Sequence, residues 1–234
     1  MKYKIILSVI FIFSLFQSNN AQEESDLLSH YKSYYAQMLK QDDAQGIINA
    51  MTHLLILEPN VKRSDTLALR YMNDGKYFQA LNLIGIDTND NDTNMTVEVK
   101  AICLKALNQP ARALEHYELL FKRIPSASLA YELADLKIQL NDLIGANLNI
   151  TYGIANCSSD MMKPFYETQQ PYQVPLKAAF LYLKAIAKYS EDPESNHDSS
   201  TALLDESLAL APEFNLAILA KNAISSKKAE LENE

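Results

Sequence analysis

Turn-forming, small and apolar residues recur along this chain at an interval of 33 residues. Four residues that accept a left-handed conformation or bond to the local backbone mark this interval. They are Asp42, Gly75, Asn108 and Asn141. Seven positions before them stand Tyr35, Ala68, Ala101 and Ala134, five after them Ile47, Ala80, Ala113 and Ala146, and nine after them Met51, Ile84, Tyr117 and Ile150. This periodicity predicts a helix–turn–helix unit copied four times.

The residue types suit two packed helices in each copy. Alanine at the first-helix position lets a neighbouring helix approach closely, and larger apolar residues fill the space between helix pairs. In the third copy, Asn108-Gln109-Pro110 ends one helix, and Pro110 suits the first turn of the next. Asp87 and Gly153 fall where a small helical residue is usual, which predicts that these second helices end early.

The C-terminal part predicts a fifth copy and a closing helix. Ala179–Tyr189 forms its first helix, with Ala185 at the small position, and Leu203–Pro212 forms its second. The turn between them, Ser190–Ser200, is longer than in the other copies. Phe214–Leu231 is apolar at its start and charged at its end, as expected of a helix that caps a helical repeat array.

An insertion at residues 158–175 does not fit the repeat. We predict a small β-hairpin from Phe165–Thr168 and Tyr172–Val174, across Gln169-Gln170. Packing on the scaffold is favoured over a role in recognition, although both interpretations stay open. The aromatic residues of interest in the insertion are Phe165, Tyr166 and Tyr172.

The repeat resembles the tetratricopeptide repeat (TPR) family over residues 27–225. The match is best at Ala113-Leu114-x-x-Tyr117-x-x-Leu120-x-x-x-x-Pro125 and at the turn Gly75–Leu81. The resemblance implies an all-α, right-handed solenoid of about five helical hairpins with a C-terminal capping helix. It also implies a concave groove that holds a partner segment, unless a part of the same chain packs there. The groove positions carried over by register are Leu39, Leu69, Met72, Ile102, Lys105, Tyr131, Asp135 and Ile138.

The N-terminus predicts an export signal over residues 1–21. Lys2 and Lys4 precede an apolar run from Ile5 to Phe16, and polar residues follow up to Ala21. The run is too short to span a bilayer comfortably, so we expect cleavage after Ala21 and a periplasmic or secreted protein. An uncleaved anchor is the alternative. Residues 22–234 then form one TPR-like domain, with no stable membrane insertion expected after cleavage.

Composition and charge argue against two classes of partner, nucleic acids and anionic membranes. The chain of 234 residues is 48% hydrophobic and has a net charge of -8, so it can bury a core but repels phosphate backbones. We therefore expect no nucleic-acid partner. The chain also lacks the basic amphipathic face that would hold it on an anionic membrane.

No constellation of residues predicts catalysis, a metal site or a cofactor. The four histidines are not spaced as ligands, and Cys103 and Cys157 are expected to be unpaired residues on packed helices. The segment 87–98 nearly fits a calcium-binding loop, but Asp92 stands where that loop needs glycine. The register explains it better as the link between two repeats, with Thr93 or Asn94 capping the next helix.

These observations leave three functional hypotheses. The first is a non-catalytic protein–protein interaction scaffold of the envelope or exterior. The second is a binder of a small molecule or glycan that uses the insertion. An enzyme is the third and the least supported.

Overall fold

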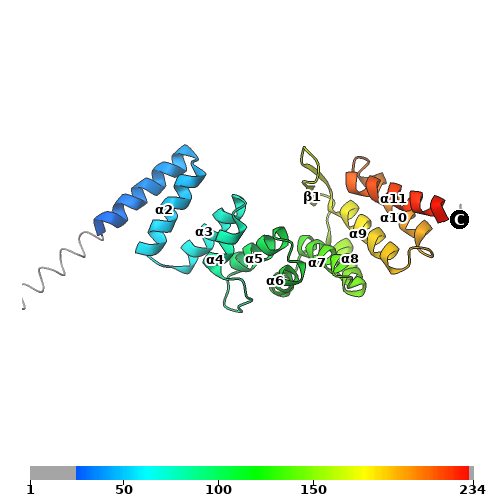
Figure 1. Cartoon of the computed structure of the whole chain (residues 1–234), viewed down its shortest axis with the longest axis horizontal. Coiled ribbons are helices and arrows are strands. Elements are labelled where there is room, and N and C mark those ends of the chain that lie inside the picture. The colour runs from blue at the N-terminus through cyan, green and yellow to red at the C-terminus, as the bar shows by residue number, and fades with distance from the viewer. Residues whose placement is uncertain (1–24, 232–234) are drawn as a thin grey trace, which may run out of the picture. The chain divides into compact units, whose positions relative to one another are not determined.

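The computed structural model describes residues 25–231, with side chains up to residue 227. The predicted signal at residues 1–21 therefore lies outside the described residues. The chain divides into two compact units, residues 1–87 and 88–234, and each is described by itself. The described residues form an all-α structure with one small β-hairpin, as the sequence predicts (Figure 1).

The first unit contains two helical hairpins (Figure 1, blue to cyan). Its elements are a helix over residues 25–41, α2 (Ala44–Leu57), α3 (Val61–Asn73) and α4 (Tyr77–Ile84). Asp43 caps α2 by accepting a hydrogen bond from the Gly46 amide, and Asn60 caps α3 in the same way. The buried residues that join these helices include Ile47, Met51 and Leu67.

In the second unit, each helix from α6 onward packs on the helix before it. Its elements are α5 (Asn94–Ala106), α6 (Pro110–Arg123), α7 (Ala127–Gln139), α8 (Leu143–Asn156), β1 (Met162–Phe165), β2 (Tyr172–Pro175), α9 (Leu176–Glu191), α10 (His197–Leu210) and α11 (Asn215–Leu231). One core cluster of this unit runs from α7 to α11 around Phe180 and Phe214.

The four predicted turn residues all adopt the left-handed backbone. The φ angles are 53° at Asp42, 71° at Gly75, 55° at Asn108 and 62° at Asn141. In every case the next residue donates its amide hydrogen to the carbonyl oxygen five positions back, at 2.8–3.1 Å. This is the bonding of a Schellman motif, which satisfies carbonyls that the end of a helix leaves open. The 33-residue interval is therefore the separation along the chain between equivalent C-terminal ends of first helices, each closed by a Schellman motif.

The small residues of the repeat lie in the core, buried between packed helices. Six alanines, three on first helices and three on second helices, have no exposed surface. They are Ala68, Ala80, Ala101, Ala113, Ala134 and Ala146. Ala185 of the fifth copy is also fully buried. These positions confirm the register of the repeat and its extension to the fifth copy.

One of the two predicted early helix ends is confirmed and the other is wrong. Helix α4 ends at Ile84, and Gly85 follows with a φ of 81°. Helix α8 instead runs through Gly153 to Asn156. A Cβ atom on Gly153 would lie 1.9 Å from the ring of Phe180, so glycine is needed here for close packing of α8 against α9.

The fifth copy has a shorter turn than the sequence predicts. Helix α10 begins at His197, six residues before the expected Leu203. The side chain of Asp192 accepts the hydrogen of the Ser195 backbone amide at 3.0 Å, and the side-chain Nδ2 of Asn196 donates to the Lys188 carbonyl at 3.0 Å. These local bonds close the turn, so helix can resume earlier. The closing helix α11 begins at Asn215, as expected.

Protein cations hold the calcium-like segment between α4 and α5. The Arg123 guanidinium donates to the carbonyls of Asp90 and Asp92, and Lys100, with 2% of its surface exposed, binds the Asp92 carboxylate at 2.6 Å. Thr93 caps α5 by accepting the Thr96 amide hydrogen. The segment is a repeat link, and no cluster of three metal-ligating side chains occurs within residues 25–227.

Both cysteines are free thiols in this structure. Burial raises the pKa of Cys103 to about 11, and Cys157 is half-buried at the end of α8. Within the described part of the chain, no helix combines the length and the apolarity that a membrane crossing requires.

The left-handed turns make a direct prediction at Asn108. We expect Asn108→Val to lower the free energy of unfolding by about 1–2 kcal/mol, because a β-branched side chain is strained at positive φ. Asn108→Gly, which accepts this conformation, is the matched control and should leave stability nearly unchanged. Urea denaturation followed by circular dichroism measures both. Equal stability of the two variants would contradict this account of the turn.

Candidate functional site

The insertion forms the predicted β-hairpin, three residues earlier than expected in its first strand. Strands β1 and β2 are antiparallel, with Phe165 opposite Tyr172 and Met162 opposite Pro175. The first strand ends at Phe165, and residues 166–171 form the connecting loop. Tyr166 lies in this loop with 73% of its surface exposed.

The hairpin packs against the helices of its own unit through aromatic rings. Phe165 is buried, with ring-centroid distances of 6.4 Å to Tyr131 on α7 and 4.9 Å to Phe214 before α11. Tyr172 stacks on Phe165 at 5.6 Å. Such edge-to-face and stacked contacts add stabilisation beyond the apolar area that they bury. The interpretation of the insertion as a packed element is confirmed.

An ionic network joins the hairpin to α5 and α7. Lys105 on α5 donates to Glu132 at 2.7 Å and to Asp135 at 2.6 Å, both on α7. Lys163 on β1 binds the other carboxylate oxygen of Glu132, and its ammonium group lies 4.8 Å from the centre of the Tyr131 ring. Glu132 is thus shared between two cations from two different elements.

The pKa shifts agree with this pairing. Burial alone would raise the pKa of Glu132, but Lys105 and Lys163 outweigh it, and the pKa is lowered. Burial alone would lower the pKa of Lys105, but Glu132 and Asp135 outweigh it, and the pKa is raised. Burial, with the carboxylates as a second cause, raises the pKa of Tyr131 and Tyr117 well above the ordinary value. The pairing therefore favours the charged forms of Glu132 and Lys105.

The groove positions carried over from the TPR family differ in accessibility. In the first unit, Leu39 is 42% exposed, and Leu69 and Met72 of α3 are half-buried. In the second unit, Ile102 of α5 and Ile138 of α7 are half-buried. Tyr131 is buried under the hairpin, and Lys105 and Asp135 bind each other. Binding of a partner at these positions stays a prediction.

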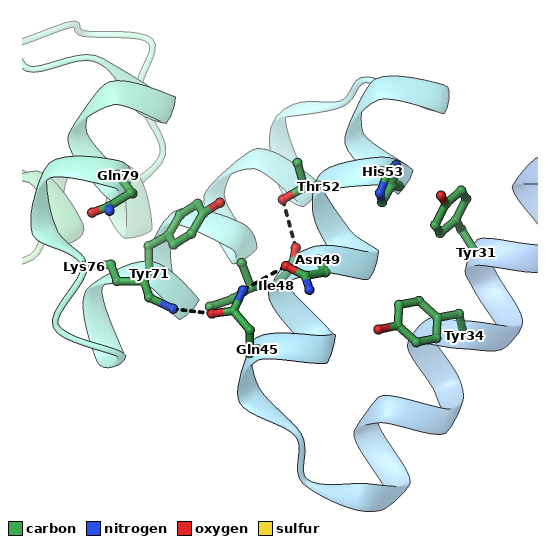
Figure 2. A pocket seen from close by; sticks show the side chains of 10 residues that line it. All are labelled: Tyr31, Tyr34, Gln45, Ile48, Asn49, Thr52, His53, Tyr71, Lys76 and Gln79. Atoms are coloured by element: carbon green, nitrogen blue, oxygen red, sulfur yellow. Dashed lines mark hydrogen bonds between the residues drawn. The ribbon is translucent and has the colours of Figure 1, made fainter.

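A separate cavity of about 580 Å³ lies in the first unit (Figure 2). Its walls come from both helical hairpins of that unit. The lining side chains are Tyr31, Tyr34, Gln45, Ile48, Asn49, Thr52, His53, Tyr71, Lys76 and Gln79. Tyr31 stacks on His53 at 4.2 Å with an interplanar angle of 15°. In Figure 2 the hydroxyls of Tyr34 and Tyr71 point into the space from opposite sides.

A chain of polar contacts orients the amides in this cavity. Asp74 binds the Lys76 ammonium at 2.5 Å, and Lys76 donates to Gln45 Oε1 at 2.6 Å. Gln45 Nε2 then donates to Asn49 Oδ1 at 2.8 Å. Because an ammonium group can only donate, it fixes which amide atom of Gln45 faces it, and the order propagates to Asn49.

Sequence reasoning missed both the network partners and the cavity. Glu132 stands next to the predicted groove residue Tyr131, and Lys163 is the one Lys or Arg of the 158–175 segment. These two facts are a weak indication in the sequence that the two side chains pair. The cavity residues lie mostly on second helices, outside the expected groove. Tyr31 and Tyr34, three positions apart on one helix face, were the available clue.

A further cavity, of about 460 Å³, lies between β2 and the turn from α10 to α11. Tyr172, Leu210, Pro212 and Phe214 contribute to its walls. The Tyr172 hydroxyl donates to Glu167 of the hairpin loop, so the group is already engaged within the insertion.

The ionic network predicts a stability change at Glu132. We expect Glu132→Gln to lower the free energy of unfolding by roughly 2 kcal/mol at neutral pH, the scale of hydrogen bonds to charged groups. Because the folded pKa of Glu132 is lowered, this stabilisation is present above its ordinary pKa and is lost as pH falls through the folded value. The difference between wild type and variant should therefore shrink below about pH 4.

Glu118→Gln is the matched control for Glu132→Gln. Glu118 pairs with Lys137 while 52% of its side chain is exposed, so this change should cost little. Urea denaturation at several pH values measures both variants. A cost at Glu132 no larger than that at Glu118 would show that the network does not stabilise the hairpin.

The sequence matches no family model and no curated protein. Solved structures are similar in fold. A tetratricopeptide repeat protein from Parabacteroides merdae ATCC 43184 has a TM-score of 0.61 at 15% identity, over 87% of this chain and 72% of that chain. The fragment of MamA from residue 41 to its end, from Desulfovibrio magneticus RS-1, has a TM-score of 0.60 at 13% identity, over 81% of this chain and 98% of that chain.

These similarities agree with the four equivalent turns and the buried alanines described above. At such low identity they bear on the fold rather than on activity or partners. The protein is a helical-repeat solenoid with the tetratricopeptide-type fold.

Proposed function

We propose that this protein is an exported, non-catalytic scaffold that binds a segment of a partner protein on the faces formed by its first helices. The fold supports this proposal, since stacked helical hairpins present extended surfaces that suit a peptide or a helix. Its particular support is the hairpin on α7. The chain's own hairpin packs on this face through aromatic and ionic contacts, which supports binding of a partner segment by the same kinds of contact.

The hairpin covers only part of that face. Tyr131 and Glu132 of α7 lie under it, whereas Glu98 of α5 is exposed and Ile102 is half-buried. A partner segment would therefore lie along α5, beside the hairpin. Lys105 is already neutralised by two carboxylates, so the exposed Glu98 favours a partner that combines apolar residues with a basic side chain.

Binding of a small molecule or glycan by the insertion has less support. The rings of Phe165 and Tyr172 stack on each other, and Phe165 also packs on Phe214. Only Tyr166 among the three named aromatic residues is largely exposed. The insertion thus uses most of its aromatic surface for its own docking.

Site-specific photocrosslinking tests the scaffold proposal. A photoreactive phenylalanine replaces Leu69 or Ile102, one position in each unit, and the protein is expressed in its native host. We expect each position to capture a discrete protein partner, identified by mass spectrometry. Ile144 on the second helix α8, which is 80% exposed, is the matched control. Capture from Ile144 alone, or from none of the three positions, would refute the proposed binding faces.

Export rests on the residues before the described structure. Lys2 and Lys4 followed by the apolar run Ile5–Phe16 support a cleavable signal. We expect the protein isolated from its host to begin at Gln22, because cleavage follows Ala21. Intact-mass spectrometry of the envelope and secreted fractions measures this. A protein that retains residues 1–21 would support an uncleaved anchor instead.

A further inference from the structure

We propose that the cavity of the first unit binds a neutral, hydroxyl-rich ligand, namely a short saccharide. The juxtaposition that carries this is an oriented Asn49 amide between phenol groups and a stacked Tyr31–His53 pair (Figure 2). The site is distinct from the proposed partner-binding faces and does not depend on them. Its volume of about 580 Å³ falls within the range of small-molecule sites, roughly 300–1,000 Å³.

The charges at the cavity favour a neutral ligand. Lys76 is the one Lys or Arg among the lining side chains, and no carboxylate stands among them. The Lys76 ammonium is bound by Asp74 at 2.5 Å and donates to Gln45 at 2.6 Å, so its charge is compensated within the protein. A strong anion would have to compete with Asp74, and a cation would meet no carboxylate among the groups that line the space.

The polar groups match hydroxyls in particular. Asn49 Oδ1 accepts from Gln45, which turns the two N–H donors of Asn49 Nδ2 toward other partners. The phenols of Tyr34 and Tyr71, directed into the cavity, can each donate and accept (Figure 2). Gln79 adds a further amide. A row of hydroxyl groups satisfies such a mixture of donors and acceptors, whereas an apolar ligand would leave these groups unpaired.

The aromatic residues give the cavity a fixed wall. Tyr31 is held by stacking on His53 at 4.2 Å, and His30 packs edge-on against it at 5.4 Å. A ring fixed in this way loses little freedom when a ligand binds.

The Asp74–Lys76–Gln45–Asn49 chain acts as a positioning device for the site. The first three members orient the amide of Asn49 before any ligand arrives. Preorganised polar groups bind more tightly because the cost of ordering them is already met by the fold. We therefore assign Lys76 and Gln45 to positioning, and Asn49 and Tyr34 to contact with the saccharide.

The test is a titration of residues 22–234 with neutral trisaccharides built from glucose, galactose, mannose or N-acetylglucosamine. Binding is followed by two-dimensional NMR and by calorimetry. We expect at least one of these sugars to bind and to shift amide signals in α2 and α4. Asn49→Leu and Tyr34→Phe should each weaken that binding about tenfold, the effect of losing one hydrogen bond. Thermal unfolding checks that both variants remain folded.

Tyr166→Phe is the control, because Tyr166 is an exposed tyrosine of the second unit. It should leave sugar binding unchanged. Trigalacturonate, adenosine and an uncharged tripeptide test the competing classes of ligand. The proposal is overturned if no neutral sugar binds by about 10 mM, a limit set by millimolar affinity. It is also overturned if trigalacturonate, adenosine or the tripeptide binds in place of the neutral sugars, or if Asn49→Leu and Tyr34→Phe bind as wild type does.

Discussion

The left-handed backbone at four evenly spaced residues is the constraint on which the rest of this structure depends. Asp42, Gly75, Asn108 and Asn141 each reverse the chain with the same hydrogen bonds, so each first helix meets its second helix at an equivalent place. Equivalent turns bring equivalent alanines into the buried core, where their small size allows close packing of helices. The helices of the repeat therefore end at regularly spaced, equivalent turns, and the core packs between the helices that these turns join.

The insertion changes what one face of the second unit can do. Its aromatic residues and Lys163 contact Tyr131 and Glu132 of α7. The same stretch of chain thereby supplies stability and restricts the surface that stays open along α5. The cavity of the first unit is independent of this face and offers a different chemistry, made of amides and phenols rather than of ion pairs.

Much of the fold could be predicted because its determinants are local. Turn residues, small residues and the closing helix follow from spacing alone, and the structure confirms them. Gly153 misled the prediction because its reason is the distant ring of Phe180, which spacing does not reveal. The Lys105–Glu132–Lys163 network and the first-unit cavity were missed for a similar cause. Each depends on side chains from three or more elements, whose approach only the folded chain shows.

The docked hairpin also has a consequence for cooperativity. In a solenoid each helix pair touches mainly its sequence neighbours, so melting can begin at an end and proceed pair by pair. Here the hairpin contacts α7 through Tyr131, Glu132 binds α5 through Lys105, and Phe165 reaches Phe214 at the start of α11. One short segment thus links α5 and α7, the first helices of two successive pairs, to the closing helix α11. The second unit should therefore unfold as a single block where an uninterrupted array would fray.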